Sequence, residues 1–183
     1  MQAEHQVLLD QAPSALSVHD TWARLCCEQG LLALEQKCYG VGAVLVNSAD
    51  ELLCSSKNQV FSEGFHSHAH AEMLLLDQFE LNAQGYNRDD LTLFVSLEPC
   101  LMCYGRILLS GITRVRYLAK DKAGGFADYL HLLPPVWRDL AVRVSVEQAN
   151  VQPYWIKLAE SLMSELQDPV VMRQRTLAAW KGM

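Results

Sequence analysis

The spacing of apolar residues changes along the chain, and this change predicts an alternation of helices and strands. Apolar positions three to four residues apart indicate amphipathic helices, whereas short β-branched apolar runs indicate strands. We expect helices over residues 20–35, 70–84, 101–110, 127–133 and 154–166. We expect strands over residues 39–46, 51–55, 91–97, 113–119 and 140–146. Residues 1–13 are expected to form a loose arm, and the chain from residue 169 a tail.

The order of these elements favours one α/β domain over residues 1–183, with a core over about residues 20–166. After the first helix, strands alternate with helices, which is typical of a single sheet covered by helices on both faces. The turn at residues 47–50 predicts a hairpin between the first two strands. The segment between the last two strands has room for a crossover helix, so we expect these strands to be parallel.

Composition narrows the class of protein. The chain has 183 residues, of which 50% are apolar and 20% charged, a balance typical of a globular domain. No apolar run approaches the roughly 18 residues of a membrane span. Residues 1–5 lack the basic start and apolar stretch of a secretory signal. We therefore expect a cytoplasmic protein without membrane association.

Charge is distributed unevenly. The formal net charge is −6, with acidic residues dominating the first hundred positions and basic residues the remainder. A protein that binds nucleic acid usually carries a basic field, so the acidic total weakens the case for a polyanionic partner. Residues 104–125 nevertheless contain a cluster of basic residues, which is consistent with a local binding site for nucleic acid. Solvated charges on helix ends and loops also explain the same residues.

The six cysteines fall into two groups. The cytosol keeps thiols reduced, which argues against disulfides, and Cys26, Cys38 and Cys54 lie in apolar or mixed surroundings typical of small buried side chains. Cys100 and Cys103 instead lie at the start of a predicted helix with two residues between them, so that both sulfurs can face one ion. A redox pair or a fragment of a structural metal site would have the same spacing. A redox pair usually follows the first strand of a thioredoxin-like unit, whereas these cysteines follow the third predicted strand.

His70 adds a nitrogen ligand from a second helix start. One imidazole and two thiolates suit Zn²⁺, and three protein ligands leave a fourth position for water, which is the catalytic arrangement. Zinc lowers the pKa of such a water toward roughly 7. Glu72 lies two residues beyond His70, so it need not be a ligand and can instead shuttle the proton of that water.

The order His-x-Glu followed by Pro-Cys-x-x-Cys is the signature of zinc-dependent nucleobase deaminases, and both motifs are present as His70-Ala71-Glu72 and Pro99–Cys103. From about residue 20 to residue 166 the chain resembles the cytidine-deaminase-like superfamily. It is most similar to the branch of tRNA adenosine, guanine and cytosine deaminases. The resemblance implies a three-layer α/β/α fold with a five-stranded mixed sheet and a homodimer.

The same resemblance implies a role for individual residues. Zinc would be held by His70, Cys100 and Cys103, and Glu72 would shuttle protons. Asn58 would hydrogen-bond the base, and the backbone of Ala71 would contact it.

Two segments depart from the family pattern. Residues 66–69 read His-Ser-His-Ala where the branch often has Asp-Pro-Thr-Ala, so His66 and His68 are either surface side chains or contacts to a substrate or second metal. After Cys103, where the tRNA enzymes usually have small residues, Tyr104-Gly105-Arg106 would narrow the pocket or alter an interface. Glu98, before Pro99, is expected to be structural, as a carboxylate at a helix start.

Two classes of function remain open. The first is a zinc-dependent deaminase that releases ammonia from a nucleobase or nucleoside. The second is a non-catalytic deaminase-like binding subunit, which would be expected to lose the Glu that is present here as Glu72. Within the first class, the acidic total favours a small nucleobase or nucleoside, whereas Arg173, Arg175 and Lys181 in the tail favour a tRNA adenosine. The sequence leaves open which base is deaminated.

Overall fold

A computed structural model describes residues 2–82, 85–164 and 168–181 of the chain. Its centre is a five-stranded sheet in the order β2-β1-β3-β4-β5. The strands are β1 (Gly42–Val46), β2 (Leu52–Lys57), β3 (Thr92–Leu97), β4 (Arg114–Ala119) and β5 (Ser145–Gln148). β1 is antiparallel to both β2 and β3, whereas β3, β4 and β5 are mutually parallel. The predicted hairpin, the mixed sheet and the parallel final pair are therefore confirmed.

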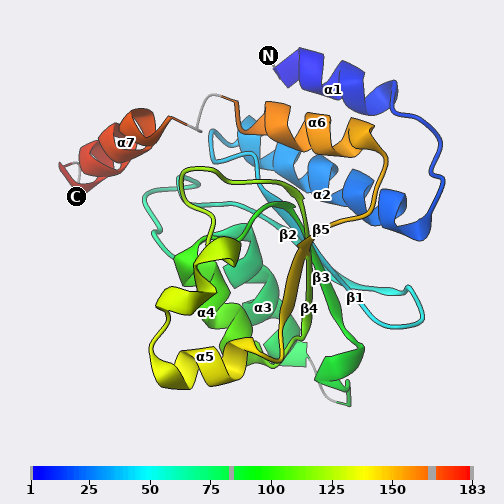
Figure 1. The fold of residues 1–183 in the computed structure, drawn as a ribbon. Coiled ribbons are helices and arrows are strands. Elements are labelled where there is room, and N and C mark those ends of the chain that lie inside the picture. Colours follow the sequence, from blue (N-terminus) through cyan, green and yellow to red (C-terminus); the bar gives the residue numbers. More distant parts are fainter. Residues whose placement is uncertain (1, 83–84, 165–167, 182–183) are drawn as a thin grey trace.

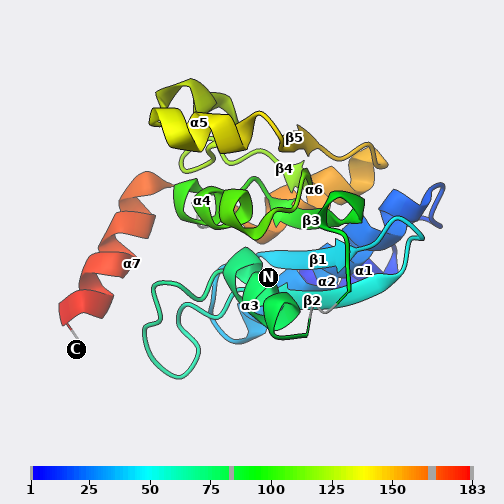
Figure 2. The same ribbon diagram turned by 90° about the horizontal axis from the view of Figure 1, so that it is seen from below.

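Helices cover both faces of this sheet (Figure 1). One layer contains α2 (Val18–Glu35) and α6 (Pro153–Leu162), with α1 (Gln2–Asp10) packed outside them. The opposite layer contains α3 (Ala71–Asn82), α4 (Leu101–Ser110) and α5 (Pro135–Ala141). Figure 2 shows the strands side by side in the order β5-β4-β3-β1-β2. The predicted three-layer α/β/α architecture is confirmed.

Close packing of α2 against β1 depends on one glycine. All five residues of β1 are buried, as expected for a central strand with helices on both faces. A Cβ atom at Gly42 would lie 2.2 Å from the backbone oxygen of Cys26 in α2. Because no side chain fits in that space, Gly42 allows the helix to approach the sheet at the start of the strand.

The predicted loose arm at residues 1–13 is wrong. Residues 2–10 form α1, whose Leu9 is buried against the core, and the Tyr154 hydroxyl of α6 donates a hydrogen bond to the backbone oxygen of Leu8. The helix is stabilised by tertiary contacts with α2 and α6. Such contacts leave little periodic signal in the sequence, because most of the stability of a short helix comes from tertiary packing rather than from local propensity.

The predicted fifth strand is present, but its predicted bounds, residues 140–146, are wrong. The alternation of Val142, Val144 and Val146 is typical of a strand, but α5 extends to Ala141, and Val142 is 84% exposed at its end. Pro135 occupies the first turn of α5, a position that favours helix initiation. The fifth strand begins only at Ser145.

Smaller differences concern the remaining predicted elements. Residues 127–132 form a 3₁₀ segment, η2 (Ala127–Leu132), and a second one, η1 (Arg88–Asp90), precedes β3. The expected tail contains a helix, α7 (Pro169–Lys181), which lies apart from the two layers in Figures 1 and 2. The predicted helix ends at residues 84 and 166 lie outside the described residues. Among the described residues, no helix combines the length and apolar character needed to cross a membrane.

Candidate active site

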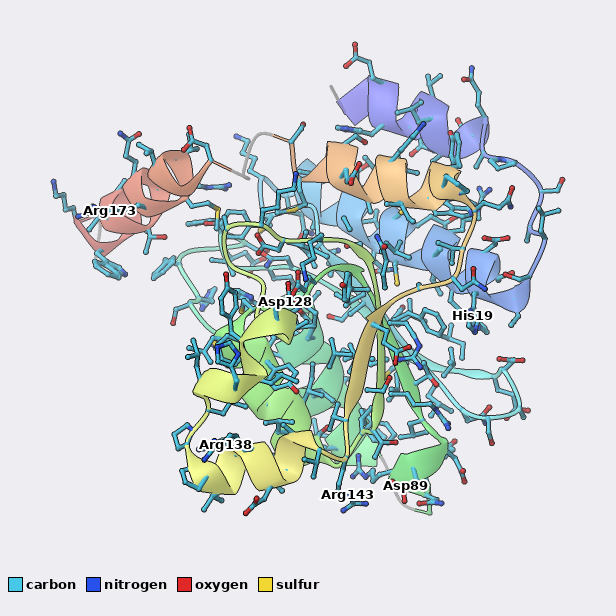
Figure 3. All side chains as sticks on the ribbon, in the orientation of Figure 1. His19, Asp89, Asp128, Arg138, Arg143 and Arg173 are labelled. Carbon is cyan, nitrogen blue, oxygen red and sulfur yellow. The ribbon has the colours of Figure 1, made fainter. Side chains whose placement is uncertain are left out.

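The candidate site lies at the carboxyl ends of β3 and β4. His70 immediately precedes α3, Cys100 is the N-cap residue of α4, and Cys103 lies in the first turn of that helix. The opposite end of the parallel strands is marked by the ion pair between Asp89 and Arg143, labelled in Figure 3. The two motifs are thirty residues apart in sequence. They lie close together in the fold because β3 ends, and α4 begins, beside the start of α3.

Three ligand atoms converge at this point. His70 Nδ1 lies 3.7 Å from Cys100 Sγ and 3.5 Å from Cys103 Sγ. All three potential ligand atoms lie within 4.8 Å of one another, and no other group of three or more His, Cys, Asp or Glu residues in the described part of the chain is arranged in this way. One imidazole and two thiols form a donor set that fits zinc. The predicted grouping of these three residues is therefore found in the fold.

The two thiols have opposite protonation tendencies. A hydrogen bond from the Cys103 thiol, together with the neighbouring His70, lowers the pKa of Cys100 to about 4 against the opposing effect of burial. The hydrogen bond to Cys100 and burial raise the pKa of Cys103 well above its usual value. Without a metal the pair thus favours one thiolate, Cys100, that accepts a hydrogen bond from the thiol of Cys103. A divalent ion would replace this arrangement by two thiolate ligands.

Glu72 lies beside this group, in the first turn of α3. It is 3% exposed, and burial followed by the charge of Cys100 raises its pKa to about 7. A carboxyl whose pKa is close to neutral can both accept and return a proton. The predicted proton shuttle therefore has a suitable location and environment.

A cavity of about 270 Å³ opens in front of Glu72 and the ligand group. Its lining combines the polar site residues with apolar side chains from several elements: Tyr39, Val41, Asn58, His70, Glu72, Leu97, Glu98, Cys100, Asp121, Ala123, Gly124, Met163 and Met172. The apolar members supply flat contact surface, and the polar ones supply orientation, which is the usual division in a small-molecule site.

The two expected substrate contacts differ in position. Asn58 is 2% exposed and lines the cavity, with its Oδ1 accepting a hydrogen bond from the backbone N–H of Val60 at 3.1 Å. This bond orients the side-chain amide and leaves its NH₂ group as the donor for a ligand. Ala71 is fully buried at the start of α3 and does not line the cavity.

The residues that depart from the family pattern have contacts away from the cavity. His66 and His68 are exposed, with their rings 6.5 Å apart. Tyr104 is buried next to Phe126, at a ring distance of 5.7 Å. Arg106 joins α4 to α3 through Glu80, at 2.6 Å, and through Asp77. None of these residues lines the cavity, so Tyr104 and Arg106 serve packing between elements rather than narrowing the pocket.

Sequence reasoning missed the contribution of the C-terminal segment. Met172 of α7 lines the cavity, and the guanidinium of Arg175 lies 3.9 Å from the ring centre of Phe61 and 5.1 Å from that of Tyr39. The attraction between the positive charge of Arg175 and the faces of these two rings stabilises the position of α7 beside the cavity. The Arg and the aromatic residues lie far apart in sequence, so no local pattern links them.

Sequence similarity extends over much of the chain. Residues 16–119, more than half of the chain, match the cytidine and deoxycytidylate deaminase zinc-binding region. A tRNA-specific adenosine deaminase of Haemophilus influenzae is 39% identical over 92 residues, but the match covers only 53% of that relative. A tRNA-specific adenosine deaminase of Streptococcus pyogenes is 30% identical over 143 residues, which cover 70% of this chain and 82% of the relative.

Similarity of fold is broader still. A solved structure described as a guanine deaminase from Nitrosomonas europaea has a TM-score of 0.58 at 20% identity, with 86% of this chain and 91% of the other covered. The expected zinc cofactor is confirmed by the family match and by the group of His70, Cys100 and Cys103. The chain belongs to the cytidine and deoxycytidylate deaminase zinc-binding family.

Proposed function

We propose that the protein removes the exocyclic amine of a nucleobase or nucleoside by zinc-dependent hydrolysis and releases ammonia. The observation that carries this proposal is the convergence of one imidazole nitrogen and two thiols next to the buried carboxyl of Glu72, at the wall of a cavity. His70, Cys100 and Cys103 would hold the metal. Zinc, when bound there, supplies the Lewis acidity that activates water as a nucleophile.

Glu72 carries the proton transfers of the reaction. Its carboxylate takes a proton from the attacking water, returns a proton to a ring nitrogen, and assists the departing amine. A carbon–oxygen bond forms, the carbon–nitrogen bond to the amine breaks, and the nitrogen leaves as ammonia. Burial, followed by the charge of Cys100, raises the pKa of Glu72 to about 7, so neither the acid nor the base form is strongly disfavoured near neutral pH.

The cavity favours a small nucleobase or nucleoside as the substrate. Val41, Leu97 and Met163 offer apolar contact to a planar ring, and the NH₂ group of Asn58 would donate a hydrogen bond to a ring or carbonyl acceptor. A volume of about 270 Å³ holds one base, and the net charge of −6 disfavours long polyanions.

A tRNA adenosine is the second candidate substrate. Its support comes from the names of the two relatives and from α7, which carries Arg173, Arg175 and Lys181 without an acidic residue. Arg173, labelled in Figure 3, lies on α7 and is exposed. A base flipped out of an anticodon loop would enter the same cavity while α7 contacts phosphates.

Ammonia release decides between these substrates. The zinc-loaded protein is assayed against guanine, adenosine, cytosine, cytidine and a tRNA, with the Glu72→Gln protein as control. We expect release from a small base or nucleoside, and tRNA binding that is weak with a shallow salt dependence. Tight tRNA binding with a slope of several units, and release from tRNA alone, would establish the second candidate. Binding of any of these compounds without ammonia release would contradict the proposal and favour a non-catalytic binding subunit.

Assembly is a separate proposal. The homodimer expected from the resemblance stays a prediction, which light scattering of the zinc-loaded protein can test.

A further inference from the structure

Glu98 is a buried carboxylate that accepts hydrogen bonds from the backbone of an adjoining loop that also lines the cavity. It is 2% exposed and lies two residues before Cys100. Oε2 accepts a hydrogen bond from the N–H of Asp121 at 3.1 Å, and Oε1 accepts one from the N–H of Ala127 at 3.0 Å. Lys120 Nζ lies 3.3 Å from Oε1 and also pairs with Asp128, which is labelled in Figure 3. Both carboxylate oxygens are therefore engaged by residues 120–127.

The backbone reinforces this attachment. Phe126 N–H donates to the oxygen of Pro99 at 3.1 Å, and Cys100 and Gly125 form an isolated β-bridge. A Cβ atom at Gly125 would lie 2.4 Å from the carboxyl group of Glu98. Only glycine permits this approach, so the loop and the residues before α4 interlock.

The attached loop forms part of the cavity wall. Asp121, Ala123 and Gly124 line the cavity, and Asp121 Oδ1 accepts hydrogen bonds from the backbone N–H groups of Ala123 and Gly124 at 3.0 and 2.9 Å. The wall is thus a tight turn, closed by Asp121 and attached at both ends to Glu98. The other attached segment carries Cys100, a member of the ligand group.

We propose that Glu98 is a positioning residue that fixes the cavity wall formed by residues 121–124 relative to the adjoining ligand group, and thereby the fit of the substrate. Its carboxylate acts through residues 121–127, because both oxygens are already occupied and the side chain is almost fully buried. A structural carboxylate at a helix start would stabilise α4 alone, whereas Glu98 connects α4 to the substrate wall. The consequence for substrate rests on the proposed deaminase function, but the attachment itself does not.

The test compares Glu98→Gln with Asp20→Asn. Gln keeps the shape of Glu but presents an NH₂ group to one of the two backbone N–H donors, which removes an acceptor and the charge. Asp20 is an equally buried carboxylate, 1% exposed, that lies away from the cavity. It accepts hydrogen bonds from the backbone N–H groups of Leu16, Ser17 and Gln152. Asp20→Asn therefore controls for the general effect of neutralising a buried, hydrogen-bonded carboxylate.

Two measurements are made on the zinc-loaded proteins. Hydrogen–deuterium exchange of peptides covering residues 120–127 should quicken at least about tenfold in Glu98→Gln, the size expected for one lost hydrogen bond to a charged group. The same peptides should exchange at the parent rate in Asp20→Asn. For ammonia release from guanine, adenosine and cytidine, we expect Glu98→Gln to raise KM about tenfold while kcat stays within about threefold and zinc remains at the parent level.

A second variant disrupts the contact between Glu98 and the loop by a change in the loop itself. Gly125→Ala places a methyl group against the Glu98 carboxyl and should reproduce the faster exchange and the raised KM. Parent-like exchange of residues 120–127 in both variants would overturn the attachment. Faster exchange with unchanged KM would overturn its effect on substrate fit. If the parent releases no ammonia from any compound, the proposed function fails, and the exchange data still decide whether Glu98 holds the loop.

Discussion

Asp20 and Glu72 occupy similar positions but have opposite electrostatic properties. Each is an acidic residue in the first turn of a helix, and they are 1% and 3% exposed. Burial alone would raise the pKa of Asp20, but hydrogen bonds from the backbone and side chain of Gln152 and from the backbone N–H groups of Leu16 and Ser17 outweigh it and lower the pKa. Burial and the charge of Cys100 raise that of Glu72 to about 7.

The difference shows what separates a structural carboxylate from one available for chemistry. Asp20 has its oxygens saturated by backbone donors and completes a capping box with Ser17, so its charge is fixed. Glu72 faces a cavity and a thiol-rich ligand group, so its protonation can change during a reaction. Burial therefore does not identify function, and the partners of the buried group do.

The largest expected effect comes from removing a ligand beside Glu72. Cys103→Ala deletes one of three converging donors, and a site with two ligands binds zinc poorly. Elemental analysis should find about one zinc per chain in the parent and far less in this variant, with deaminase activity lost. Cys27→Ala, which removes a buried thiol remote from the site, should keep its zinc. Full zinc occupancy in Cys103→Ala would show that the metal is held elsewhere.

The second expected effect separates the two carboxylates by chemistry. Glu72→Gln preserves shape and removes the proton shuttle, so turnover should fall about 10²- to 10⁴-fold. Zinc content should stay at the parent level because Glu72 is not in the ligand group. The melting temperature should change little, since a neutral side chain avoids the cost of burying a charge. Turnover within about threefold of the parent, measured as ammonia release per zinc-loaded molecule, would remove Glu72 from the mechanism.

The site was more predictable from the sequence than its surroundings. His70, Glu72, Cys100 and Cys103 lie in two short motifs, because helix starts fix the direction of the side chains within a few residues. The contacts of Glu98 with Asp121 and Ala127 span 23 and 29 residues, and no local period encodes such a connection. Glu98 was expected to be a structural carboxylate at the start of α4, and this was correct only in part. Its side chain accepts hydrogen bonds from the backbone of Asp121 and Ala127, which lie in a segment remote in sequence.

The same distinction explains the errors in the fold. β1 and β3 were predictable because strands buried on both faces consist of continuous apolar runs. Val142, Val144 and Val146 have the alternation of a strand, yet the proline at the start of α5 and its packing place Val142 at a helix end. α1 and α7 depend on a few contacts with distant residues, such as Leu9 with the core and Arg175 with Phe61. Tertiary contacts thus overrode local pattern at both ends of the chain.

The third expected effect is on stability alone. Asp20→Asn replaces a charged acceptor of three backbone N–H groups, and the loss of such bonds destabilises the protein by about 1.5–3 kcal/mol. For a chain of this size, each kcal/mol corresponds to roughly 2–4 °C in melting temperature. Thermal unfolding followed by circular dichroism should show this decrease, while ammonia release per folded molecule stays at the parent rate. A fall in turnover as large as that of Glu72→Gln would contradict the division between the two carboxylates.

The smallest expected effect is the pH dependence of the Asp20 contribution. Because the folded pKa of Asp20 lies below its usual value, the unfolded chain binds the proton more readily than the folded one. The stabilisation is therefore fully present above the unfolded pKa of about 3.9, and it is lost as the pH falls through the lower folded value. The stability difference between the parent and Asp20→Asn should be constant from about pH 5 to 7 and shrink below about pH 4. Urea unfolding at a series of pH values measures this difference directly. A difference that grows on acidification would mean that the folded pKa of Asp20 is raised, and that burial rather than hydrogen bonding dominates its environment, as it does for Glu72.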